Sequence, residues 1–186
     1  IKTVRQKYNL PEKYILYLGT IEPRKNIQLL IQAFEKVALK DKDVKLVIAG
    51  VNGWLYKQIH QAIDNSPFRD RILRIGFVAV EDKPIVYKLA RVFVYPSLYE
   101  GFGFPPLEAM ASGTPTIVSN NSVFPEIVLN AAYKTSPYDV IELSEIIYNL
   151  LTDNSLYEYY SKQGLERSLD FNWHKTAQEM REVFIS

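Results

Sequence analysis

The sequence predicts an α/β fold: a Rossmann-like, doubly wound parallel sheet of about six strands, with helices on both faces and a helical C-terminal segment. Two observations predict it. Short, almost wholly apolar runs recur up to residue 119, and several end in glycine, as expected for strands buried on both faces. Amphipathic stretches separate these runs, and strands that alternate with helices pair in parallel through right-handed crossovers.

The elements follow in order along the chain. The first strand is predicted at residues 14–19, YILYLG, and the helix after it at 26–39, because its apolar residues are spaced three and four apart. The second strand, VKLVIAG, is predicted at 44–50 and the second helix at 54–63. Further strands are predicted at 72–77, 92–95, 116–119 and 131–134, with helices at 83–90 and from 107, the latter ended by Gly113. The last helices are predicted at 140–151, 155–169 and 174–184, with Asn172 as a candidate cap.

The length of 186 residues fits a single domain with one core. Residues 1–13 are interpreted as a linker that approaches the first strand, and residues 139–186 as C-terminal helices. Because the chain opens on Ile1, we expect it to be a fragment of a longer protein.

Composition excludes several classes of function. The 22 Lys and Arg residues nearly balance 21 Asp and Glu, so the net charge of +1 gives no general attraction to nucleic acid or anionic lipid. The absence of cysteine excludes disulfides and thiolate metal sites, and two histidines argue against zinc. With no apolar run of about 20 residues and no signal peptide, a soluble, cytoplasmic chain is expected.

Glycines mark the carboxyl ends of the predicted strands, where sheets of this class bind ligands, often at helix N-termini. They are Gly19, Gly50, Gly76 and the pair Gly101 and Gly103. Each one alone is explained equally well as an ordinary strand-to-helix turn. Together they outline one rim of the sheet.

The segment YPSLYEGFGFPPLEAMASGTP, residues 95–115, concentrates unusual residues on this rim. It places Glu100 after the fourth strand, whereas Pro105 and Pro106 suit the first turn of the next helix, where Glu108 is also expected. Free N–H groups at a helix start, close to glycines, can hold phosphate or polyhydroxyl groups. Two carboxylates that accept hydroxyl hydrogen bonds suit a sugar, although Glu108 alone could be a favourable charge near the helix dipole.

A basic pair lies on the same predicted rim, in the stretch GTIEPRKNI at residues 19–27. Arg24 and Lys25 fall just before the first long helix, where they could neutralise a diphosphate. The alternative is a solvated pair of charges. Cations are slightly unfavourable at the positive end of a helix, and this position therefore favours an anion site.

Four stretches, in order, resemble the C-terminal, nucleotide-sugar-binding half of a retaining glycosyltransferase of family 4 with the GT-B fold. They are GTIEPRKN, VIAG, IGFV and YPSLYEGFGFPPLEAMASGTPTIVSNNSVFPEI. The last contains the two glutamates of the family, Glu100 and Glu108, separated by seven residues. The stretches cover most of residues 14–139, and FNWHKTAQEM resembles the closing helix of the family.

This resemblance implies a role for each matching residue. Glu100 and the amides of residues 101–103 would contact the transferred sugar, Glu108 would bind the ribose hydroxyls, and Lys25 with Arg24 would stabilise the leaving diphosphate. The backbone near Phe77 and Val78 would line the base pocket. The donor-binding set implied by the resemblance is Gly19, Thr20, Phe77, Val78, Gly101, Phe102, Gly103, Phe104, Leu107 and Glu108.

The resemblance also implies a reaction: transfer of a glycosyl unit from a nucleotide-sugar to an acceptor hydroxyl, with retention. Fixed cations and helix N-termini can stabilise the departing diphosphate, so no metal cofactor is expected, and no DxD-type metal motif is found. Many members carry Arg directly after the first glycine, where this chain has Thr20, so either Arg24 compensates or phosphate binding is weaker. The GTIEPRKN variant resembles bacterial mannosyltransferases of polysaccharide assembly, which indicates GDP-mannose.

Two other functions are compatible with parts of the pattern. Paired carboxylates also serve glycosidases, but the basic pair and the Rossmann-like pattern argue against that class. A nucleotide-binding or nucleotide-sugar-binding module without catalysis is the second alternative. In two-domain GT-B enzymes the acceptor site belongs to the N-terminal half, which this chain lacks, so the acceptor glycan or lipid-linked glycan and any membrane association would depend on that half. We therefore expect the chain alone to bind nucleotide but to transfer sugar slowly or not at all.

Overall fold

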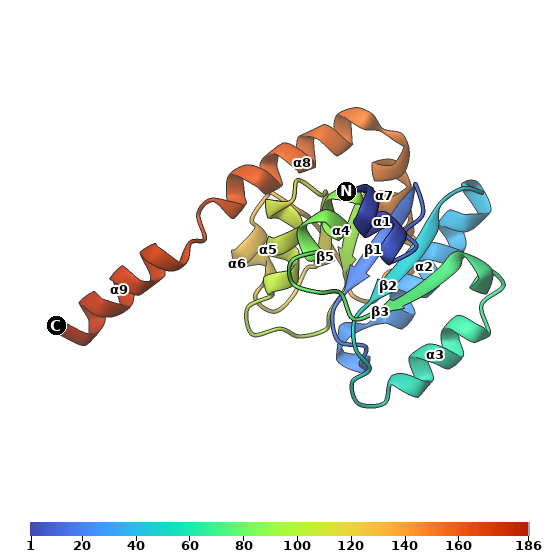
Figure 1. Ribbon diagram of the computed structural model, residues 1–186, viewed down its shortest axis with the longest axis horizontal. Helices are drawn as coiled ribbons and strands as arrows, with labels where there is room; N and C mark the ends of the chain where they lie inside the picture. The colour runs from blue at the N-terminus through green and yellow to red at the C-terminus, as the bar shows by residue number, and fades with distance from the viewer. Residues whose placement is uncertain (186) are drawn as a thin grey trace.

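The computed structural model describes residues 1–185, and these contain one sheet of six parallel strands (Figure 1). The strands are β1 (Tyr14–Leu18), β2 (Lys45–Ala49), β3 (Ile72–Gly76), β4 (Val92–Tyr95), β5 (Thr116–Ser119) and β6 (Tyr133–Thr135). Their spatial order is β3-β2-β1-β4-β5-β6, and every neighbouring pair is parallel. The predicted doubly wound sheet is therefore confirmed.

Helices cover the sheet in two layers. The long and short helices are α1 (Lys2–Lys7), η1 (Pro23–Lys25), α2 (Ile27–Lys40), α3 (Tyr56–Asp64), η2 (Arg69–Arg71), α4 (Lys83–Leu89), α5 (Phe104–Ala111), α6 (Phe124–Val128), α7 (Val140–Thr152), α8 (Asn154–Ser168) and α9 (Trp173–Ile185). One layer joins α2 to α3 and α7, and the other joins α5 to α4 and α8, with α1 against α4. Helix α9 extends away from this body and ends far from it (Figure 1).

The burial of each strand follows its place in the sheet. All residues of the central strands β1 and β4 are buried, which explains their uninterrupted apolar sequences. The edge strand β3 has a neighbouring strand on one side only. Its first residue, Ile72, is buried, and the four residues after it alternate between half-buried and exposed. The core therefore lies around the middle of the sheet, beneath the loops that follow β1 and β4.

Several boundaries differ from the predictions. The segment predicted as a linker contains α1, which sequence patterns missed because it is six residues long, buries only Val4 and has no side-chain cap. Helix α5 begins at Phe104 rather than 107, because Pro105 is accommodated in its first turn. Glu108 is consequently the fifth residue of α5, and its predicted position in the first turn is wrong. The predicted cap is confirmed, since Lys175 N donates to Asn172 Oδ1 at 2.7 Å.

Among residues 1–185, none of the helices combines the length and apolar character that crossing a membrane requires.

Candidate functional site

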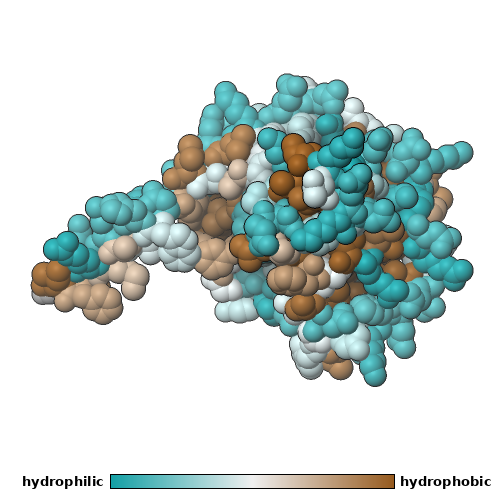
Figure 2. All heavy atoms as spheres, viewed as in Figure 1, coloured by the Kyte–Doolittle hydropathy of each residue, from teal (hydrophilic) through white to brown (hydrophobic). Residues whose placement is uncertain are grey.

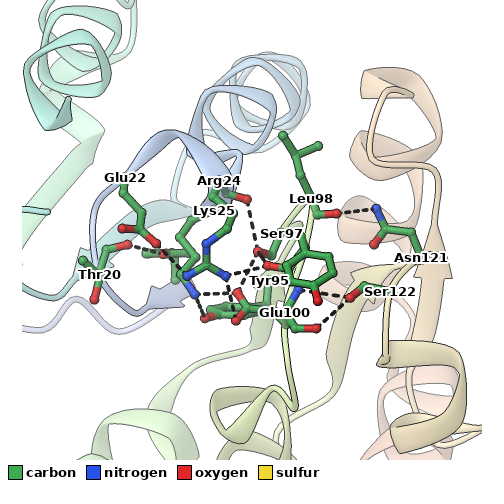
Figure 3. A network of polar contacts seen from close by, with 12 residues as sticks. Thr20, Glu22, Arg24, Lys25, Tyr95, Ser97, Leu98, Glu100, Asn121 and Ser122 are labelled. Carbon is green, nitrogen blue, oxygen red and sulfur yellow. Dashed lines mark hydrogen bonds and ion pairs between the residues drawn. The ribbon is translucent and has the colours of Figure 1, made fainter. Parts of the chain in front are cut away.

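The strand order reverses between β1 and β4. From β1 the chain continues outward through β2 and β3, and then returns to the other side of β1 as β4. The loops after β1 and β4 therefore leave the sheet side by side, and open α/β sheets bind ligands at such a switch point. Lys25 follows β1 and Glu100 follows β4, so this topology brings together residues that are 75 positions apart (Figure 3).

A buried ion pair occupies the switch point. Lys25 Nζ lies 2.5 Å from Glu100 Oε1 and donates to the hydroxyl of Tyr95 at 2.8 Å. Arg24 Nη1 lies 3.1 Å from Glu100 Oε2, and Ser97 Oγ donates to Glu100 Oε1 at 2.7 Å (Figure 3). Only 6% of Lys25 is exposed, so the alternative of a solvated basic pair is wrong for this residue.

Hydrogen bonds to the main chain fix the loop that carries Glu100. Leu98 N donates to Arg24 O at 2.8 Å, which joins this loop to the one after β1. On its other side, Asn121 Nδ2 donates to Leu98 O at 2.9 Å and Ser122 Oγ donates to Glu100 O at 2.7 Å (Figure 3). Loops from three neighbouring strands thus hold one another, and the carboxylate is positioned before any ligand binds.

The environment of Glu100 keeps it ionised. Burial alone would raise the pKa of its carboxyl group, but hydrogen bonds from Lys25 and Ser97 and the adjacent positive charges outweigh burial and hold the pKa below its ordinary value. Burial, and then the nearby negative charge of Glu100, raise the pKa of Tyr95, so its hydroxyl stays protonated. A glycosidase needs a carboxyl group that is protonated near neutral pH, and Glu100 is unsuited to that role.

The glycines beside Glu100 have different structural reasons. Gly103 is the N-cap of α5 at φ +91°, and a Cβ atom there would lie 2.9 Å from the Phe124 ring. A Cβ atom on Gly101 would meet nothing within 4 Å, so packing does not require glycine at that position. Pro105 and Pro106 carry no N–H, so Phe104 supplies the only N–H among the first three residues of α5, directly after the amides of residues 101–103. This segment can therefore receive oxygen atoms of a ligand on its main-chain amides.

Glu108 belongs to a second, more open cluster. Its Oε2 accepts a hydrogen bond of 2.8 Å from the buried Tyr87 hydroxyl, and Lys83 Nζ lies 3.3 Å from its Oε1. The Glu108 side chain is 38% exposed. It lines a groove of about 720 Å³ that Phe102, Phe104 and Leu107 share with residues of the α8–α9 connection and α9. Figure 2 shows apolar surface on the body close to where α9 leaves it.

The other predicted residues lie on the same rim, with different exposure. Gly19 and Thr20 follow β1, and Thr20 O accepts a hydrogen bond of 2.8 Å from the Tyr17 hydroxyl. Phe77 follows β3 and is 66% exposed, whereas Val78 is 3% exposed and its side chain belongs to the core. Arg24, Lys25 and Glu100 are in direct contact, whereas Glu108 lies in a separate cluster.

Sequence reasoning missed the polar residues that support both carboxylates. They are Tyr95, Ser97 and Ser122 around Glu100, and Lys83 and Tyr87 around Glu108. Tyr95 and Ser97 could have been found, because Tyr95 ends β4 and Ser97 lies two residues later, immediately before the glutamate loop. Lys83 and Tyr87 carry no such signal, because only the packing of α4 against α5 brings them to Glu108.

Within residues 1–185, no group of three or more His, Cys, Asp or Glu side chains is arranged to hold a metal ion.

The fold and its charged switch point define a Rossmann-like domain of the kind that forms the C-terminal domains of GT-B glycosyltransferases. The family described as "Glycosyl transferases group 1" matches residues 1–167, and the chain belongs to this family. The chain is 40% identical over 172 residues to O-antigen chain mannosyltransferase B of Escherichia coli, a match that covers 91% of this chain and 45% of the relative.

Solved structures agree on the fold. Sucrose-phosphate synthase of Thermosynechococcus elongatus superimposes with a TM-score of 0.87 at 29% identity, covering 99% of this chain and 48% of that one. Alr3699/HepE of Anabaena, solved in complex with UDP, gives a TM-score of 0.86 at 21% identity, covering 98% of this chain and 51% of that one. The chain therefore spans about half the length of these three proteins.

Proposed function

We propose that this chain is the donor-binding part of a glycosyltransferase that transfers a glycosyl unit from a nucleoside diphosphate sugar to an acceptor hydroxyl, with retention of configuration. The observation that carries the proposal is the Lys25–Glu100 pair at the switch point, flanked by Arg24 and by the start of α5. Membership of the glycosyl transferases group 1 family and the likeness to an Escherichia coli mannosyltransferase support it.

In the proposed reaction, the bond between the anomeric carbon and the diphosphate oxygen breaks, the acceptor oxygen bonds to that carbon, and the acceptor's hydroxyl proton passes to the departing diphosphate. Negative charge grows on the departing diphosphate. Lys25 and Arg24 are the cations that would stabilise it, and fixed charges of this kind act more strongly on the transition state than on the ground state. Because Lys25 is already paired with Glu100, the diphosphate would share or replace one of its contacts.

Glu100 and the main-chain amides of residues 101–103 would face the sugar, and the orientation of that carboxylate by Ser97 suits this role. Glu108 would accept hydrogen bonds from the ribose hydroxyls, for which its partly exposed carboxylate is suited. The base would lie against the connection after β3, near Phe77 and Val78. Gly19 and Thr20 would lie near the phosphates. Because Thr20 carries no positive charge, either Arg24 would supply the cation there or phosphate binding would be weaker.

GDP-mannose is the donor proposed first, because proteins similar to this chain include two O-antigen chain mannosyltransferases. The Anabaena protein was solved with UDP and with UDP-glucose, which supports a nucleotide-sugar donor while leaving UDP as the other base to test. The acceptor, a glycan or lipid-linked glycan, would bind through the part of the longer protein outside this chain. No metal cofactor is proposed, and the cytoplasmic location stays a prediction.

Calorimetric titration of the chain with GDP, UDP and ADP tests the proposal. One nucleotide is expected to bind saturably, and Lys25→Ala and Glu108→Ala each to weaken its binding by roughly ten- to a hundredfold, since each removes a charge-assisted hydrogen bond. Lys162→Ala and Glu166→Ala, on exposed residues of α8, are the matched controls. A folded wild-type chain that binds none of the three nucleotides, or variants that bind as the wild type does, would refute the proposal.

Transfer is tested on the longer protein with GDP-mannose and a glycan acceptor, and the anomeric configuration of the product is read by NMR. Inversion would overturn the proposed stereochemistry. Fast transfer by the 186-residue chain alone would contradict our expectation that it binds donor without efficient turnover.

A further inference from the structure

Hydrogen bonds and an ion pair join the end of α1 to the connection between β3 and α4, residues 77–82. The Tyr8 hydroxyl, just after α1, accepts a hydrogen bond from Ala79 N at 3.1 Å and donates one to Asp82 Oδ2 at 2.9 Å. Lys7 Nζ lies 2.7 Å from the same carboxylate oxygen. The Asp82 side chain is 14% exposed, so the start of the chain partly encloses it.

Apart from the buried side chain of Val78, this connection lies at the edge of the sheet. It leaves β3, an edge strand, through Gly76, whose φ is +70° and whose added Cβ atom would meet nothing within 4 Å. Inside the connection, Asp82 N and Lys83 N both bond to Ala79 O, which forms a compact turn. The Tyr8 hydroxyl bonds to both ends of that turn, at Ala79 N and Asp82 Oδ2. The residue that follows α1 therefore holds the turn in place.

The same connection reaches the second carboxylate cluster. Lys83 follows Asp82 directly and lies 3.3 Å from Glu108. Phe77 and Val80 are 66% and 70% exposed on the connection, whereas Val78 between them anchors it in the core. A shift of the turn at residues 79–82 would thus move both an exposed apolar surface and the cation beside Glu108.

We propose that Tyr8 and Asp82 are positioning residues for the nucleoside half of the donor. They hold residues 77–83 in the shape that receives the base and keeps Lys83 at Glu108, without touching the ligand themselves. The inference rests on the proposed function, since it names the structural support of that same site. Its ligand class is a nucleoside diphosphate, and the diphosphate half alone, bound at Lys25 and Arg24, is expected not to depend on α1.

The test is a pair of calorimetric titrations, one with GDP or UDP, whichever the wild type binds, and one with inorganic pyrophosphate. Tyr8→Phe is expected to weaken nucleotide binding about three- to tenfold, by loss of the hydroxyl, and to leave pyrophosphate binding unchanged. Tyr148→Phe removes a hydroxyl from α7, outside the rim, and is the matched control. Hydrogen exchange at the Ala79 amide should be faster in Tyr8→Phe, which reports release of the turn directly.

Each outcome of these titrations either supports or overturns the positioning role of Tyr8. Equal losses for nucleotide and pyrophosphate, or no loss for either, would overturn the positioning role. If Tyr8→Phe fails to fold, Asp82→Asn, which keeps an acceptor for Tyr8 but removes the charge that pairs with Lys7, is judged by the same split between ligands. A folded wild type that binds no nucleotide would refute the proposed function and this inference with it, whereas wild-type binding that both variants leave intact would refute this inference alone.

Discussion

Glu100 and Glu108 are eight positions apart on one loop and helix, yet their surroundings differ in almost every physical respect. The Glu100 side chain is 10% exposed and contacts two cations and a serine, with a contact of 2.5 Å to Lys25. The Glu108 side chain is 38% exposed, and its cation stands 3.3 Å away. A buried carboxylate without a cation would be costly, so Glu100 needs its protein partners in the folded chain. Water can solvate the more exposed carboxylate of Glu108.

This difference in burial and charge pairing indicates that the cluster around Glu100 contributes more to the stability of the fold than the cluster around Glu108. Tyrosines support both carboxylates, since Tyr95 bonds to Lys25 beside Glu100 and Tyr87 bonds to Glu108 directly. Around Glu100, however, the loops that carry its partners are also bonded to each other, since Leu98 N donates to Arg24 O. We therefore expect substitutions around Glu100 to affect both folding and ligand binding, and substitutions around Glu108 to affect mainly ligand binding.

The largest effect is expected from Lys25→Ala, which leaves the Glu100 carboxylate enclosed with Arg24 and Ser97 only. The free energy of unfolding should fall by about 3 kcal/mol, the lower end of the range for breaking a buried ion pair, because those two partners remain. Urea denaturation measures it. The double variant Lys25→Met with Glu100→Gln should regain part of the loss, because no uncompensated charge is left. A single variant as stable as the wild type would erase the distinction between the two sites.

A smaller effect should separate the two tyrosines. Tyr95→Phe removes an acceptor from a buried ammonium group and should cost about 1 to 2 kcal/mol of unfolding free energy. Tyr87→Phe removes a donor from a carboxylate that water can reach, and should cost under about 1 kcal/mol. The same urea titration compares them. Equal costs, or a greater cost for Tyr87→Phe, would mean that burial does not distinguish the two clusters.

The smallest effect is expected on mild acidification, through Glu100. Its pKa is lower in the folded chain than the ordinary value of 4.5, so between the two values the unfolded chain binds more protons and stability rises with pH. The stabilisation is complete above the unfolded pKa and is lost as the pH falls through the folded pKa. The stability difference between wild type and Glu100→Gln should therefore narrow below about pH 4.5.

Two other carboxyl groups serve as an internal control for that experiment. Lys13 and main-chain N–H groups hold the pKa of Asp41 down against burial, and Lys7 and Tyr8 lower that of Asp82. Both titrate alike in wild type and variant, so they cancel in the difference. Parallel pH profiles for the two proteins would show that Glu100 is not stabilised in its ionised form.

The pattern of apolar runs predicted the strands well because burial on both faces dictates uninterrupted apolar sequence, as in β1 and β4. It failed for α1 and α6, which are six and five residues long, too short to show a helical period. The rim was predicted from glycines and charges. The contact between Lys25 and Glu100 was not, because it depends on β1 lying beside β4, which no local pattern encodes.

The packing around the rim glycines also decides where donor specificity could be engineered. A Cβ atom on Gly50 would lie 1.9 Å from Gly19 O, at a φ of +138°, so position 50 should be kept as glycine in any combinatorial library. Gly101 has open space around it. A library randomised at position 101 would therefore sample new side chains where the sugar is proposed to bind, with little burden on folding.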